Sequence, residues 1–160
     1  MSFDDGVPND VDVFGVKSRM RAAMFDRGIT MSALQTRSQV TQEDLERAFA
    51  TVEIGNPEAF RVLSLTANAI GVSPQWVLMG TGESPLSAVG RIVRLAWEFV
   101  YRSGLSVPDG KQFEAWLRGR FGQPAINANG ANELFRNKAP QKLLDIGPLY
   151  DNFRREMRSR

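Results

Sequence analysis

The side chains that could do chemistry in this 160-residue chain are carboxylates, basic groups, hydroxyls and amides, because the sequence contains no cysteine and no histidine. This composition excludes thiol nucleophiles, disulfides, zinc sites built from Cys and His, and histidine acid–base catalysis. Carboxylates alone can still bind magnesium or calcium. However, no Asp-x-Asp-x-Asp-Gly loop, Gly-x-x-x-x-Gly-Lys loop or Gly-x-Ser-x-Gly elbow is present. We therefore expect a protein that is not an enzyme and that uses no metal and no cofactor.

The charged residues are divided unevenly along the chain. Residues 1–85 carry 7 Lys or Arg and 11 Asp or Glu, a net charge of −4, whereas residues 86–160 carry 13 and 7, a net charge of +6. Four of the acids lie before residue 13, so residues 13–85 are balanced at 7 against 7. The basic second half favours anionic partners. Residues 1–12 are expected to form an acidic, disordered tail.

The sequence carries no signal for a membrane. Its apolar runs are shorter than the roughly 18–20 residues that span a bilayer. The acidic start, MSFDDGVPNDVDVF, lacks the basic and apolar regions of a signal peptide. We therefore expect a cytoplasmic protein with no membrane partner.

Residues 13–85 have the pattern of successive short helices. An apolar stripe with spacings of three and four predicts a first helix that ends at Gly28; its members are Val13, Val16, Met20, Ala23 and Met24. Thr30 and Thr41 can each cap a further helix, and Asp44 can complete a capping box with Thr41. The three residues 38–40 between these helices suit the turn of a helix-turn-helix.

Two more helices are expected before residue 85. Asn56 and Pro57 provide the cap and first residue of one helix, which runs to Gly71. Ser73 and Pro74 begin another in the same way, and Trp76 within it is expected to be a core residue.

Several of these residues match a known pattern in register: Thr30, Leu34, Val40, Thr41, Leu45, Arg47, Asn56 and Pro57, followed by Ile70, Gly71, Val72, Ser73, Trp76 and Gly80 of AIGVSPQWVLMGTG. Residues 13–82 thereby resemble the lambda-repressor-like, Cro- or XRE-type helix-turn-helix family, in the style of phage repressors. The resemblance implies a five-helix DNA-binding domain over residues 13–85. Three positions depart from the family: Met31 replaces a phosphate-holding glutamine, Gln35 a small residue, and Gln39 the turn glycine. Two additional residues also precede Pro57.

The resemblance assigns DNA contacts to particular residues. The first residues of the helix after Thr41 would meet base edges in the major groove; they are Thr41, Gln42, Glu43, Glu46 and Arg47. Gln suits adenine, Glu suits the amino group of cytosine, and Arg suits guanine or a phosphate. Alternatively, the acids of this helix only form a solvated first turn. Phosphate contacts are expected from Lys17, Arg21, Ser32 and Arg37, with Arg19 and Arg27 as further basic candidates.

The second half predicts more helices and a self-association surface. Residues 86–103 form an amphipathic pattern whose apolar face comprises Leu86, Val89, Ile92, Val93, Trp97 and Val100. Because this face is too apolar to leave in water, we expect residues 86–160 to be a helical oligomerisation domain with a basic C-terminal tail. Packing within one chain is the alternative. Further helices are predicted around Phe113–Phe121, near residues 130–138, and at the C-terminus, where Gly147-Pro148 should interrupt the last one. Phage repressors sometimes carry a self-cleaving protease domain in this half. We exclude it here, because that domain is β-rich and residues 86–160 have helical patterns.

The sequence therefore predicts an all-α, sequence-specific DNA-binding transcriptional repressor of phage or prophage type. Its expected partners are a double-stranded DNA operator and further copies of itself, as a homodimer or higher oligomer, with an antirepressor protein as a third candidate. The alternative is a protein-interaction module, resembling an antirepressor or antitoxin, that keeps the fold without reading bases. Met31 and the acidic residues that follow Thr41 favour this alternative. The Trp76–Gly80 ending and the basic second half favour the repressor.

Overall fold

The computed structural model describes residues 11–122 and 139–159, and every regular element in these ranges is a helix. The expected all-α class is confirmed for this part of the chain. The chain divides into two compact units, Met1–Leu86 and Ser87–Arg160. Val11 is 5% exposed and Asp12 caps the first helix, so the predicted disordered tail of residues 1–12 is wrong for these two residues. The rest of that predicted tail, residues 1–10, lies outside the described residues.

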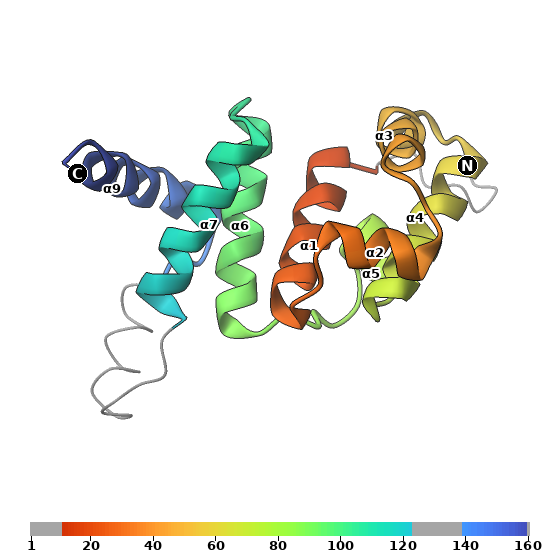
Figure 1. Cartoon of the computed structure of the whole chain (residues 1–160), viewed down its shortest axis with the longest axis horizontal. Coiled ribbons are helices and arrows are strands. Elements are labelled where there is room, and N and C mark those ends of the chain that lie inside the picture. Colours follow the sequence, from red (N-terminus) through yellow and green to blue (C-terminus); the bar gives the residue numbers. More distant parts are fainter. Residues whose placement is uncertain (1–10, 123–138, 160) are drawn as a thin grey trace. The chain divides into compact units, whose positions relative to one another are not determined.

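Unit 1 consists of short helices whose ends follow the local chemistry of the sequence (Figure 1). Its elements are α1 (Val13–Arg27), α2 (Met31–Ser38), α3 (Gln42–Thr51), the 3-10 turn η2 (Val52–Ile54), α4 (Pro57–Ile70) and α5 (Pro74–Met79). The side chains of Thr30, Thr41, Asn56 and Ser73 each accept a hydrogen bond from a backbone N–H in the first turn, as the sequence predicts. Gly28 and Gly71 end their helices in the left-handed region.

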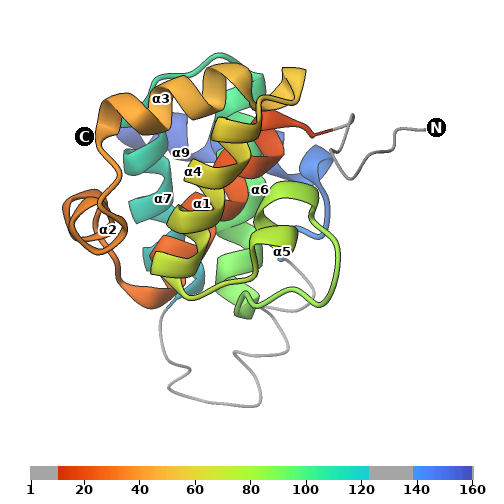
Figure 2. The same ribbon diagram turned by 90° about the vertical axis from the view of Figure 1, so that its right-hand side faces the viewer.

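The helices of unit 1 pack around α4. Both α2 and α3 contact α4, while α5 contacts α1 and α4 (Figure 2). Leu34, Leu45 and Leu63 bring α2, α3 and α4 together and are at most 1% exposed. Trp76 is 4% exposed, so the prediction that it is a core residue is confirmed. The core thus holds α3 in place from its inner side.

The turn between α2 and α3 is formed without glycine. Gln39 adopts φ 58° and ψ 30°, a left-handed conformation, and its N–H donates to the carbonyl of Gln35. Among the described residues it is the one non-glycine residue with a positive φ. Val40 follows and is 4% exposed. The chain therefore turns within the three residues 39–41, and α3 begins directly after Thr41.

Unit 2 contains α6 (Ala88–Arg102), α7 (Val107–Phe121), the 3-10 turn η3 (Leu143–Asp145) and α9 (Ile146–Arg158) (Figure 1). The hydroxyl of Ser87 accepts from the N–H of Gly90, which starts α6 two residues later than the sequence suggested. The predicted interruption at Gly147-Pro148 is wrong: both residues lie in the first turn of α9, where proline is tolerated. The helix expected near residues 130–138 lies outside the described residues.

Candidate nucleic-acid interface

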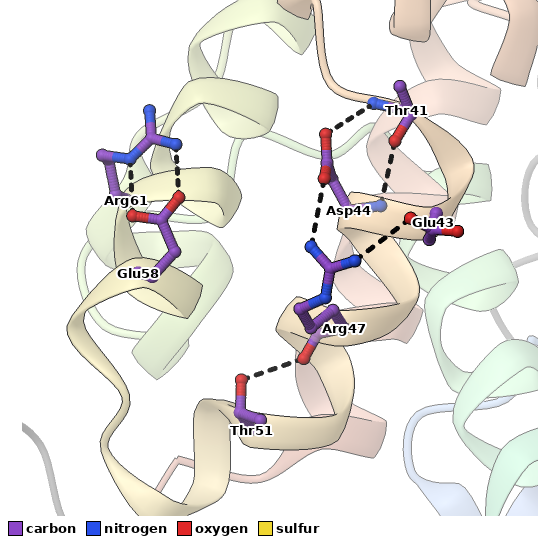
Figure 3. Close-up of polar contacts among 7 residues, drawn as sticks. All are labelled: Thr41, Glu43, Asp44, Arg47, Thr51, Glu58 and Arg61. Atoms are coloured by element: carbon purple, nitrogen blue, oxygen red, sulfur yellow. Dashed lines mark hydrogen bonds and ion pairs between the residues drawn. The ribbon is translucent and has the colours of Figure 1, made fainter.

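The first turn of α3 is fixed by a reciprocal pair of hydrogen bonds. The Thr41 hydroxyl accepts from the N–H of Asp44 at 3.0 Å, and the Asp44 carboxylate accepts from the N–H of Thr41 at 3.3 Å (Figure 3). Hydrogen bonding of the Asp44 carboxylate by the backbone N–H of Thr41, and next by its side chain, lowers the pKa of Asp44, and the nearby Arg47 and Arg61 lower it further. The predicted capping box is confirmed. It holds the beginning of α3 rigidly, which is a requirement for any site that depends on the direction of these side chains.

The outer side of α3 gathers the five predicted base-contacting residues. Thr41, Gln42, Glu43, Glu46 and Arg47 are all exposed, while Leu45 and Ala48 on the other side of the helix are buried. The side chain of Arg47 is 62% exposed and that of Glu43 is 82% exposed. A single helix therefore presents amide, carboxylate and guanidinium groups toward solvent on one surface.

The guanidinium of Arg47 is held by two neighbouring carboxylates. Its Nη2 lies 3.1 Å from Glu43 Oε1, and its Nη1 lies 3.4 Å from Asp44 Oδ1 (Figure 3). Exposed pairs at such helix spacings contribute little to stability, because water and salt screen them. Arg47 can therefore leave these carboxylates for another acceptor at small cost.

The carboxamide of Gln42 is oriented by two hydrogen bonds. Gln35 on α2 donates through Nε2 to Gln42 Oε1 at 3.2 Å, and Gln42 donates through Nε2 to Glu46 Oε2 at 3.2 Å. A carboxamide has two lone pairs and two N–H protons, so one acceptor and one donor position of Gln42 remain. The sequence analysis noted Gln35 only as a departure from the family pattern, and the structure shows that it contacts the helix predicted to read bases.

A second ion pair lies beside α3 on α4. Arg61 Nε donates to Glu58 Oε1 at 3.0 Å, and this bonding lowers the pKa of Glu58 and raises that of Arg61 (Figure 3). Across α3 and this pair, four carboxylates (Glu43, Asp44, Glu46 and Glu58) face two guanidiniums (Arg47 and Arg61), a net charge of −2. The surface is acidic overall, although cations lie within it.

The predicted phosphate contacts lie on the two helices next to α3. Ser32 and Arg37 are exposed on α2, while Lys17 and Arg21 are partly exposed on α1. The ammonium of Lys17 lies 5.2 Å from the ring centroid of Phe49 on α3. The pKa of Lys17 is lowered, first by burial and then by Arg21, and the opposing effect of Glu46 is smaller. Lys17 is thus closely associated with the inner edge of α3.

Arg19 has a different role from the one the sequence suggested. Its Nε donates to the carbonyl of Val77 at 2.8 Å and its Nη2 to the carbonyl of Leu78 at 3.2 Å. These are carbonyls at the C-terminal end of α5, where a cation compensates the helix dipole. The candidate phosphate contact is therefore wrong for Arg19, which instead ties α1 to α5.

The predicted oligomerisation face is already covered in a single chain. Leu86, Ile92 and Val93 are at most 5% exposed, as are Trp97 and Val100, and Val89 is partly buried. Trp97 donates to Glu114 of α7 at 2.9 Å, and Phe99 at the other edge of the face lies 5.4 Å from Tyr150 of α9. This face therefore needs no second copy to cover it. Its side chains pack within one chain, which was the alternative that the sequence left open.

Comparison with known proteins adds no further site. No protein-family model matches the chain, and no solved structure matches it significantly. Within residues 11–122 and 139–159, no three carboxylates lie close enough together to hold a metal ion. In the same ranges, none of the helices combines the length and the apolar character needed to cross a bilayer.

Proposed function

We propose that this protein is a sequence-specific DNA-binding transcriptional repressor, and that α2, the turn and α3 form a helix-turn-helix of the lambda-repressor-like type. The observation that carries the proposal is the exposed start of α3, where Gln42, Glu43, Glu46 and Arg47 share one surface on a capped helix. A recognition helix enters the major groove with such N-terminal residues toward the bases. The protein would act on phage or prophage DNA in the cytoplasm.

The hydrogen-bonding groups of α3 are suited to bases. Gln42 retains one acceptor and one donor beside its bonds to Gln35 and Glu46, which is the pair of groups that adenine requires. Arg47 can exchange Glu43 and Asp44 for guanine, because a good bidentate base contact contributes about 1–3 kcal/mol of discrimination, several times the strength of an exposed ion pair. Glu43 and Glu46 can accept from cytosine.

The affinity would come from basic residues outside α3. Arg37 and Ser32 on α2 and Arg21 on α1 can contact phosphates on either side of the groove. Exposed arginines on α9 of unit 2 add positive charge; they are Arg154, Arg155 and Arg158. Each phosphate neutralised by such a group makes binding more dependent on salt.

A second candidate function is favoured by the charge of the α3 surface. Because this surface has four carboxylates and two guanidiniums, it repels a phosphate backbone and suits a basic protein partner. In this alternative the chain is a protein-interaction module, comparable to an antirepressor or antitoxin, that does not read bases.

A gel-shift experiment separates the two functions. The full chain is titrated onto duplex DNA from upstream of its own coding sequence and onto a scrambled duplex, each at about 50 and 200 mM salt. The repressor proposal expects tighter binding to the first duplex at both salt concentrations. Equal binding to both duplexes, or no binding to either, contradicts it and supports the protein-interaction module.

A further inference from the structure

An open apolar groove lies between α7 and α9 within unit 2. Its volume is about 560 Å³. The residues that line it are Gln112, Ala115, Trp116, Gly119 and Arg120 of α7, and Phe153, Glu156 and Met157 of α9. Neither the fold of unit 2 nor the proposed function of α3 explains why this surface is apolar.

The groove has an apolar floor and a polar rim. Trp116 and Phe153 both line it, with their ring centroids 5.9 Å apart, and Met157, which also lines it, is 37% exposed. The polar lining residues, Gln112, Arg120 and Glu156, are all exposed. A small-molecule site usually has buried polar groups that orient the ligand, and this lining has none. An apolar centre containing Trp and Met, surrounded by charged groups, is the anatomy of a protein–protein interface.

The charges on the rim are complementary to each other. Arg120 lies on α7, with its guanidinium 5.3 Å from the ring centroid of Trp116, while Glu156 lies on α9. Neither has an ion-pair partner among the described residues. Consider two copies related by a twofold axis that passes through the groove. The cation on one side of the groove in each copy then faces the anion of the other copy.

We propose that this groove is a homodimer interface, in which a second copy of the chain occupies it. Met157 of each copy enters the groove of the other, and Arg120 of each copy pairs with Glu156 of the other. The outer faces of α7 and α9 around the groove also take part, because a stable interface covers about 800 Å² on each partner. This inference does not depend on DNA binding or on the apolar face of α6.

Charge reversal tests the dimer. The molar mass of the full chain is measured by sedimentation equilibrium between about 1 and 100 μM, a range that covers micromolar dissociation constants. The wild type is expected to dimerise. Arg120→Glu and Glu156→Arg are each expected to weaken the dimer at least about tenfold, because each places two pairs of like charges across the interface. The double variant Arg120→Glu/Glu156→Arg restores opposite pairs and should recover the wild-type mass.

Two further variants test the apolar contact and the specificity of the charges. Met157→Glu should also weaken the dimer, and its partly exposed position leaves the fold intact, which circular dichroism checks. Lys111→Glu, an exposed charge reversal on α7 outside the groove, should leave the dimer unchanged. A wild type that is monomeric throughout the range overturns the proposal and leaves the groove to another occupant. It is equally overturned if the single variants dimerise as the wild type does, or if the double variant stays as weak as the single ones.

Discussion

Replacing Gly110 with alanine should place a methyl group inside the packing radius of Trp97. A Cβ built on Gly110 would lie 2.4 Å from Cζ3 and 2.6 Å from Cη2 of this ring. Because carbon atoms pack at about 3.5–4.0 Å, the ring or the helix must move by roughly 1 Å. Trp97 is 1% exposed and donates to Glu114 at 2.9 Å, so it has little space in which to move.

The expected loss of stability follows from three contributions. Overpacking a well-packed core costs about 1–3 kcal/mol. Displacing the indole weakens its hydrogen bond to a charged group, which is worth about 1.5–3 kcal/mol when lost completely. Removing glycine from a helix interior offsets these costs by about 0.5–1 kcal/mol. We expect Gly110→Ala to destabilise unit 2 by about 1–3 kcal/mol, which corresponds to roughly 5–20 °C in melting temperature for a unit of this size.

Urea unfolding followed by tryptophan fluorescence and circular dichroism measures this effect. The matched control is Gly147→Ala on α9 of the same unit, since a Cβ there would meet nothing within 4 Å and Gly147 does not line the groove between α7 and α9. The control should be neutral or more stable than the wild type by up to about 1 kcal/mol. If both variants unfold at the same urea concentration, the close approach of α7 to Trp97 does not constrain unit 2.

Three other predictions concern unit 1. Trp76→Ala should cost about 3–5 kcal/mol because a large buried side chain is lost, and an unchanged melting temperature would contradict this. Thr41→Ala removes the cap of α3 and should cost about 0.5–2 kcal/mol in urea unfolding, whereas a wild-type midpoint would show that the cap is dispensable. The lowered pKa of Asp44 means that its carboxylate stabilises the fold above about pH 4 and that this contribution is lost as pH falls through the lower folded pKa. In the Asp44→Asn variant, the free energy of unfolding should therefore fall less steeply with decreasing pH below about pH 4. A fall as steep as that of the wild type would count against the role of Asp44.

The features that the sequence predicted well depend on neighbouring residues. Thr30, Thr41, Asn56 and Ser73 cap their helices through bonds that span two or three residues, so the local pattern was sufficient. Trp76 is buried as expected because large aromatic side chains on a short apolar helix have few other places to go. Residues of α3 share an outward face because the periodicity of a helix places them there.

The features that could not be predicted depend on distant residues. The apolar face of α6 indicated burial, but periodicity does not say which element provides the cover, and α7 and α9 provide it. Arg19 looked like a surface cation, and its acceptors lie 58 and 59 residues further along the chain. The contact of Gln35 with Gln42 likewise requires the turn at Gln39 to bring α2 and α3 together. For Gly147-Pro148, the same pair can break a helix or start one, and packing against the rest of unit 2 decides.

Binding-site selection from a randomised DNA duplex library measures whether α3 reads base sequence. The wild type should enrich a defined sequence. The variant Gln42→Ala/Arg47→Ala should lose this preference while keeping its weak, salt-dependent binding to any duplex. Arg61→Ala is the matched control, since Arg61 is also exposed and paired with a glutamate but lies on α4; it should enrich the wild-type sequence. If the wild type enriches no sequence, or if the double variant enriches the same one, α3 does not read DNA and the claim is contradicted.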